Sequence, residues 1–164
     1  MRNLEELTTF GEYGYHKGFY KSEDMEKSLL NIKYSDFGEE PNDMDFPYDT
    51  AFPLLYGSCH HFALSLQKML GYNPYIIEGK NGGSFHAFCQ IYANKTWYYA
   101  DARGITSSLN EFMKVAKTFV NDEYVIRPVN SNDIEEWEED SNYNEEAYAF
   151  AEAIISKYKD LYTS

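Results

Sequence analysis

The sequence has few cysteines and no long apolar run. Cys59 and Cys89 are the only thiols among its 164 residues, too few for the disulfide framework of a small secreted protein. No apolar stretch is long enough to span a bilayer, and residues 1–6 lack the apolar core of a secretory signal. We therefore expect a cytoplasmic protein with free thiols and no membrane partner.

Basic residues are also scarce. The 14 Lys and Arg residues stand against 27 Asp and Glu residues, and the formal net charge at pH 7 is −13. Such a charge repels a phosphate backbone, so ordinary nucleic-acid binding is not expected. The charge suits a basic protein partner, but it also keeps a protein soluble without any partner. Net charge alone therefore excludes one class of ligand and names none.

Aromatic residues, in contrast, are abundant, with 16 Tyr and 11 Phe. Disordered chains are poor in such residues, so a packed core is expected. Because the length suits one domain and no linker divides the chain, we predict a single domain over residues 1–164, with helical additions at both ends of an α+β unit. Periodicity predicts helices over residues 22–32, 59–70, 108–117 and 147–161, and strands over residues 75–78, 85–92, 96–100 and 124–129.

Cys59 lies in the first turn of one predicted helix. Ser58 before it is a good N-cap, and Gly71 after the apolar-periodic segment is a good terminator. Unpaired backbone N–H groups and the helix dipole stabilise an anion in a first turn, so they lower the pKa of a thiol there. The same N–H groups can stabilise an oxyanion. Cys59 is therefore a candidate nucleophile, although a buried core cysteine gives the same pattern.

His86 opens a predicted strand and Asp101 closes the next one. An imidazole beside a thiolate can act as a general base and return the proton to the leaving group. A carboxylate can orient that imidazole and stabilise its charged form. Taken alone, each residue is more readily interpreted as structural. A two-residue loop at Ala93-Asn94 would place His86 directly opposite Asp101, and a slip of two residues would leave them diagonal neighbours on one face.

The order of these residues resembles the core of transglutaminase-like proteins, which belong to the wider papain-like group. Gly57-Ser58-Cys59 looks like the nucleophile segment, His86-Ala87-Phe88 like the histidine strand, and Trp97-Tyr98-Tyr99-Ala100-Asp101 like the aspartate strand. The resemblance covers about residues 57–104. It implies a papain-like α+β fold, in which a nucleophile helix packs on an antiparallel sheet.

The resemblance also implies roles and a reaction. Cys59 would be the nucleophile, His86 the base and acid, and Asp101 the orienting carboxylate. Proteins with this core include protein cross-linking and deamidating enzymes, peptidases and peptide N-glycanases, so the implied activity is a cysteine-dependent hydrolase or acyltransferase acting through a thioacyl intermediate. Its substrate would be a protein, a peptide or a small amide. Water as acceptor gives a hydrolase and an amine gives a transferase, and the sequence leaves both open.

The chain departs from the papain-like pattern at the oxyanion donor, because no Gln stands at the papain-like spacing ahead of Cys59. Tyr56 or the backbone N–H of Cys59 is the expected substitute. Ser58 and His60 flank the nucleophile and join the predicted substrate or oxyanion residues. Arg103 is expected either to bind a substrate carboxylate or phosphate, or to form a structural salt bridge.

A metal site is one alternative. The zinc-ligating residue types in this region are Cys59, His60, His61 and His86. Adjacent residues of a helix point in different directions, and the sequence has neither a Cys-x-x-Cys nor a His-Glu-x-x-His motif. We therefore expect no metal and no other cofactor.

A binding protein without catalytic activity is the other alternative. A very acidic protein can cover a basic surface as an inhibitor or a DNA mimic, and a papain-like protein that has lost its activity can serve as a binding module. The acidic residues that favour this reading are Glu135, Glu136, Glu138, Glu139 and Asp140. A charge mimic does not require the three triad residues, so the enzyme is the preferred interpretation.

Overall fold

The computed structural model describes residues 29–30, 33, 50–55, 58–80, 85–93, 95–116, 123–139, 145–157 and 159–162. Within these residues the chain forms a five-stranded antiparallel sheet in the order β4-β3-β2-β1-β5. Its strands are β1 (Asn73–Gly79), β2 (Phe85–Ala93), β3 (Thr96–Asp101), β4 (Gly104–Thr106) and β5 (Tyr124–Pro128). The predicted α+β class is therefore confirmed.

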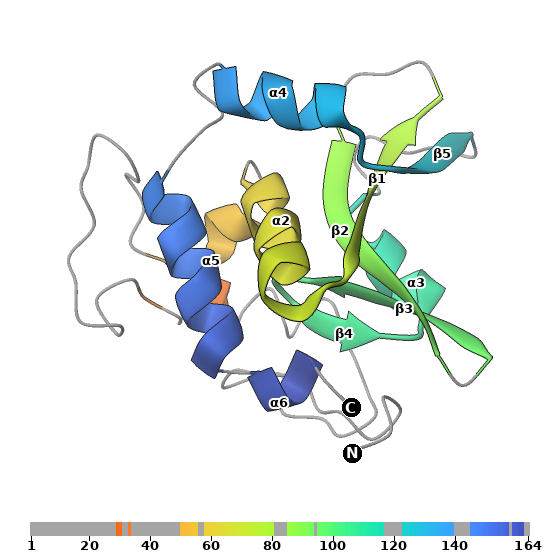
Figure 1. The fold of residues 1–164 in the computed structure, drawn as a ribbon. Coiled ribbons are helices and arrows are strands. Elements are labelled where there is room, and N and C mark those ends of the chain that lie inside the picture. Colours follow the sequence, from red (N-terminus) through yellow and green to blue (C-terminus); the bar gives the residue numbers. More distant parts are fainter. Residues whose placement is uncertain are drawn as a thin grey trace.

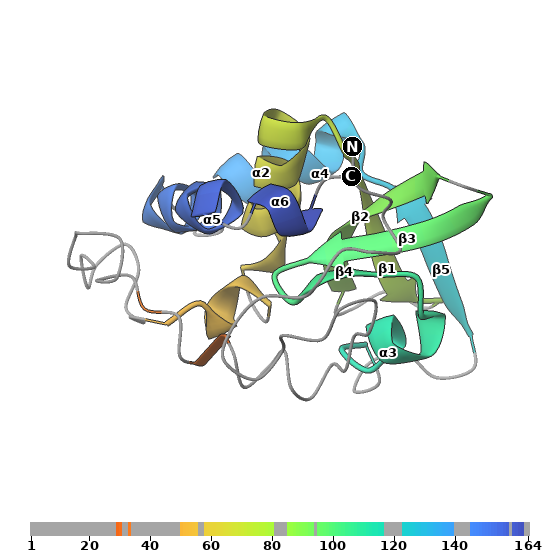
Figure 2. The ribbon, with the colours of Figure 1, turned by 90° about the horizontal axis from the view of Figure 1, so that it is seen from below.

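Helices cover both faces of this sheet (Figures 1 and 2). They are η3 (Phe52–Leu54), α2 (Cys59–Leu70), α3 (Leu109–Met113), α4 (Ser131–Glu139), α5 (Glu145–Lys157) and α6 (Lys159–Tyr162). Figure 2 shows α2, α4, α5 and α6 on one side of the sheet and α3 on the other. One hydrophobic core cluster includes residues from Leu29 to Tyr162. None of the helices in the described part of the chain has the length and apolar composition needed to cross a membrane.

The helix α2 occupies the segment that the sequence predicts for it. Gly71 ends it with φ of 75°, a left-handed conformation that glycine adopts without strain, and its N–H donates to the carbonyl of Gln67 (2.9 Å). Phe62 and Leu66 are buried and fix the face that packs on β2 and α5. Ser58 occupies the N-cap position as predicted, but its side chain makes no capping hydrogen bond.

The register of β2 against β3 differs by two residues from the one that a loop at Ala93-Asn94 would give. Cys89 pairs with Ala100. Continuing this ladder does not bring His86 directly opposite Asp101. It leaves them diagonal neighbours, and because residues two apart on a strand share a face, the two side chains still point to the same side.

The remaining elements agree in part with the sequence. The strands β1 and β5 and the helix α3 were expected, and the side-chain oxygen of Ser108 accepts the Glu111 N–H at the start of α3 (3.3 Å). The helix α4 and the short strand β4 were not expected, and the predicted C-terminal helix is split into α5 and α6. Of the helix predicted over residues 22–32, only Leu29 and Leu30 lie within the described residues, and both are helical.

Candidate active site

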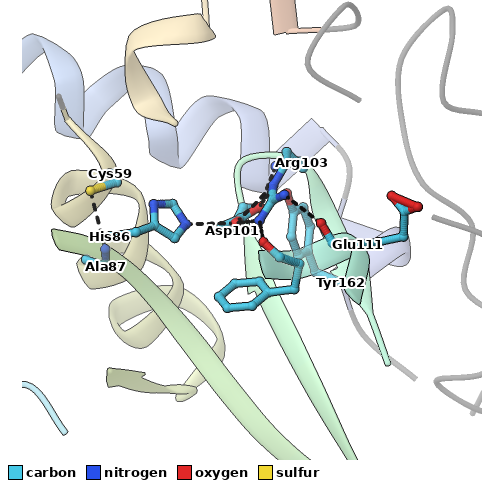
Figure 3. Close-up of polar contacts among 8 residues, drawn as sticks. Cys59, His86, Ala87, Asp101, Arg103, Glu111 and Tyr162 are labelled. Atoms are coloured by element: carbon cyan, nitrogen blue, oxygen red, sulfur yellow. Dashed lines mark hydrogen bonds and ion pairs between the residues drawn. The ribbon is translucent and has the colours of Figure 1, made fainter. Parts of the chain in front are cut away.

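Cys59 is the first residue of α2, and its side chain is 6% exposed. The Sγ atom accepts a hydrogen bond from the backbone N–H of Ala87 in β2 (3.3 Å). This contact holds the start of α2 against the strand that carries His86 (Figure 3). The helix that begins with Cys59 and the strand that carries His86 therefore meet at the thiol.

His86 lies between Cys59 and Asp101 (Figure 3). Its Nε2 is 2.9 Å from Oδ2 of Asp101, and both side chains are almost completely buried. The other ring nitrogen lies on the side of the thiol in Figure 3. The structure thus brings together the three residues that the sequence singles out, and Nδ1 is the ring nitrogen left to exchange a proton with sulfur.

The surroundings of the thiol favour its ionised form. Burial raises the pKa of Cys59, but hydrogen bonds from His60 and His86, the charge of His86 and the Ala87 N–H outweigh burial and lower the pKa to about 6. Burial lowers the pKa of His86, but its bonds to Asp101 and Cys59 and the charges of both residues raise it above the ordinary value. Between these two pKa values the pair exists as thiolate and imidazolium.

Arg103 is the second partner of Asp101. Its guanidinium is fully buried and donates to both carboxylate oxygens, with Nη2 2.6 Å from Oδ2 and Nε 3.1 Å from Oδ1. Burial raises the pKa of Asp101, but the charge of Arg103 and the bond to His86 hold it well below the ordinary range. Arg103 also donates to the backbone carbonyls of Glu111 and Phe112 (3.3 and 3.1 Å). Of the two roles expected for Arg103, the structure shows the salt bridge, here with Asp101. It gives no support to the other role, the binding of a substrate carboxylate or phosphate.

Tyr162 in α6 also contacts the triad, although the sequence gave no reason to single it out. Its side chain is fully buried, and its hydroxyl donates to the backbone carbonyl of Asp101 (2.8 Å). The helical periodicity of the C-terminal segment instead places Leu161 on the buried face. The contact of Tyr162 with the end of β3 depends on the tertiary packing of α6, which no local pattern signals.

The other predicted site residues have different surroundings. Ser58 is half-buried just before Cys59. His60 is buried, stacks on Trp137 of α4 with ring centroids 5.0 Å apart, and forms a side-chain hydrogen bond that lowers the pKa of Cys59. His60 is therefore a neighbour of the thiol. Tyr56 lies outside the described residues.

The surroundings of the second cysteine, in contrast to those of Cys59, favour the protonated thiol. Cys89 is fully buried in β2, and its Sγ donates to the backbone carbonyl of Ala63 (3.4 Å). Burial, together with the charge of Asp101, raises the pKa of Cys89 far above the ordinary value for a thiol. Among the residues that the structure describes, no three His, Cys, Asp or Glu side chains are grouped as a metal site.

The three comparisons with known proteins found nothing: no family model, no curated protein and no solved structure matches this chain. The chemistry of the site is therefore inferred from its own geometry.

The contrast between the two thiols predicts selective labelling. At pH 6 iodoacetamide should alkylate Cys59 much faster than Cys89, because about half of the Cys59 population is thiolate at its pKa of about 6 and Cys89 stays protonated. Peptide mass spectrometry after timed labelling measures both rates. In denaturant the two residues should react alike, and slow, equal labelling of the folded protein would contradict the predicted site.

Proposed function

We propose that the chain is a cysteine-dependent hydrolase or acyltransferase with a papain-like triad, acting on an amide, a peptide or a related acyl bond. The observation that carries the proposal is the bond of 2.9 Å between Nε2 of His86 and Oδ2 of Asp101, beside a helix-tip thiol. The lowered pKa of Cys59, about 6, supports it, because the thiolate is the nucleophilic form.

In the first half of the reaction, the thiolate of Cys59 attacks the carbonyl carbon of the substrate and pushes an electron pair onto the carbonyl oxygen. The first turn of α2 leaves backbone N–H groups without intrahelical partners, and these can stabilise the oxyanion. His86 then gives its Nδ1 proton to the leaving amine as the carbon–nitrogen bond breaks. A thioacyl group remains on Cys59.

In the second half, Nδ1 of His86 takes a proton from the acceptor, which then attacks the thioacyl carbon. The carbon–sulfur bond breaks, and the thiolate and imidazolium are restored. Asp101 stabilises the imidazolium and fixes the ring through Nε2. Water as acceptor makes the protein a hydrolase, and an amine makes it a transferase.

An activated ester tests this chemistry without knowledge of the natural substrate. Incubation with p-nitrophenyl acetate should transfer an acetyl group to Cys59, which intact-mass and peptide mass spectrometry detect and neutral hydroxylamine removes as expected for a thioester. Cys89→Ser should acetylate like the wild type, whereas His86→Gln should acetylate slowly because it loses the imidazolium that stabilises the thiolate. Equal acetylation of His86→Gln and the wild type would refute the proposal.

Turnover should show a bell-shaped dependence on pH. The pKa of Cys59 is lowered, so kcat/KM should rise as the pH increases through about 6, where the thiolate forms. The pKa of His86 is raised, so activity should fall at a pH above its ordinary value of 6.5, where the imidazolium loses its proton. In Asp101→Asn the pKa of His86 loses the support of the carboxylate, and the basic limb should move to lower pH while some activity remains. Stopped-flow release of p-nitrophenol across the pH range measures both limbs.

A further inference from the structure

The last described helix supplies a contact behind the triad that the chemistry above does not use. Asp101 ends β3, and its backbone carbonyl accepts the hydroxyl proton of Tyr162 at 2.8 Å. Both residues are buried. The bond joins two positions that are far apart in the sequence, so it exists only when α6 has docked beside the end of β3.

Tyr162 is itself held in place by the part of the structure that carries the nucleophile. Its ring lies against Phe62 of α2, with ring centroids 6.0 Å apart. Its backbone carbonyl accepts the hydroxyl proton of Tyr72, which follows the end of α2. Tyr162 therefore connects the helix of Cys59 with the strand end of Asp101.

The two groups on Asp101 restrain different parts of the residue. Arg103 holds both oxygens of the carboxylate, through its side chain and through its backbone N–H, which donates to Oδ1 (2.9 Å). Arg103 is also bonded to the backbone carbonyls of Glu111 and Phe112, so it holds the carboxylate group relative to α3. The bond from Tyr162 comes from another element, and it fixes the main chain of Asp101 relative to the rest of the domain.

We propose that Tyr162 is a positioning residue for the triad: its hydroxyl fixes the main chain of Asp101 so that the carboxylate stays aimed at Nε2 of His86. The inference rests on the proposed function, because positioning has a meaning only if His86 and Cys59 act as a pair. Loss of the hydroxyl lets the end of β3 shift and weakens the bond between Asp101 and His86. A weaker bond lowers the proton affinity of His86 and, through it, the thiolate fraction of Cys59.

The titratable and charged groups around this cluster come from several elements. They include Cys59 and His60 of α2, His86 and Cys89 of β2, Asp101 of β3, Arg103 and Tyr72. The Tyr162→Phe variant leaves all of them in place and removes one neutral hydroxyl. A change in the ionisation of Cys59 in this variant therefore reports a change of geometry and not a lost charge.

The test compares Tyr162→Phe with Tyr72→Phe by the rate of iodoacetamide labelling of Cys59 between pH 4 and pH 9, and by the melting temperature. Both variants lose one tyrosine hydroxyl from the same cluster, but only Tyr162 contacts Asp101. In Tyr162→Phe we expect the apparent pKa of Cys59 to rise by roughly half a unit, and the labelling rate at pH 6 to fall about twofold. In Tyr72→Phe, which keeps the bond from Tyr162 to Asp101, the labelling profile should shift clearly less than in Tyr162→Phe, whatever the melting temperature does.

Three outcomes distinguish the possibilities. A lower melting temperature of Tyr162→Phe with an unchanged labelling profile would overturn the inference, because Tyr162 would then be structural only. Equal shifts of the profile in both variants would also overturn it, because the profile would follow the packing of α6. An ordinary thiol profile for Cys59 in the wild type would refute the proposed function itself, and the inference with it.

Discussion

Replacing Cys59 by serine is expected to abolish turnover while the domain stays folded. The serine oxygen can still accept the N–H of Ala87, and both side chains are small, so the free energy of unfolding should change by no more than about 1 kcal/mol. A hydroxyl does not ionise as this thiol does, and losing the nucleophile of such a triad lowers kcat on the order of 10⁴-fold or more. Release of p-nitrophenol and thermal melting measure the two effects on the same samples.

The matched control is Cys89→Ala, which removes the other thiol from the strand that carries His86. It should keep turnover, because Cys89 is protonated and its sulfur lies in the core, where it donates to the carbonyl of Ala63. Full biological activity of a folded Cys59→Ala variant would instead support an acidic binding protein. A large fall in the melting temperature of Cys59→Ala would identify Cys59 as mainly a core residue.

Replacing Arg103 by methionine is expected to destabilise the fold strongly. The guanidinium and the Asp101 carboxylate are both buried, and removal of Arg103 takes away the larger of the two charges that compensate this carboxylate. Breaking such a pair costs about 3–5 kcal/mol of unfolding free energy. Denaturation in urea at pH 7 measures this loss.

Arg127→Met is the control for that prediction. Arg127 also pairs with two carboxylates, Glu78 and Asp133, but its side chain is 32% exposed and water screens both pairs. Its loss should cost about 1 kcal/mol or less. Equal losses in the two variants would show that the buried pair has no special role in stability.

The pH dependence of stability should change in the Arg103 variant as well. The pKa of Asp101 is lowered below its ordinary value of 3.8 in the folded state. A lowered pKa gives a stabilisation that is complete above the ordinary value and is lost as the pH falls through the folded value. Without Arg103 the folded pKa rises toward or above 3.8, so this acid-range loss should shrink or reverse in sign.

The parts of the fold that local sequence determines could be predicted. The apolar positions of α2 recur at helical spacing, and Gly71 ends the helix with a conformation that glycine favours, so the position of Cys59 at the helix tip follows from neighbouring residues. The register between β2 and β3 does not follow from neighbouring residues. Ala93 pairs with Thr96, so the connection between β2 and β3 lies one residue later than a loop at Ala93-Asn94. Lys95 in this connection adopts φ of 62°, a conformation that Gly or Asn usually signals in a sequence.

The composition of α4 explains why the sequence did not predict it as a helix. Most of its residues are acidic, and Trp137 is the large apolar side chain that it buries. Its start is fixed by a reciprocal cap, in which Asp133 N–H donates to the side chain of Asn130 and Asn130 N–H donates to the carboxylate of Asp133, both at 2.9 Å. Asp133 also binds Arg127 from β5. The Asn-x-x-Asp spacing was the available signal.

The support of the triad could not be predicted from local patterns. The proposed roles of His86 and Asp101 are suggested by their positions at strand ends, but the partners of Asp101 depend on tertiary packing. Arg103 is buried in the short connection between β3 and β4, and Tyr162 is buried at the end of α6. A charged residue and a C-terminal tyrosine both resemble surface residues until these connections are known.

The opposite pKa shifts of Cys59 and His86 connect folding to an internal proton transfer. Above the ordinary His86 value of 6.5, and up to the raised pKa of His86 or the ordinary Cys59 value of 9.0, whichever is lower, the unfolded chain holds one proton on sulfur and the folded chain holds one on the imidazole. Both states bind the same number of protons there, so this pair makes unfolding free energy nearly independent of pH in that window. Below it, stability falls as the pH drops through the folded pKa of Cys59, about 6. The chain therefore acquires its reactive thiolate by folding, without exchanging a net proton with the solvent.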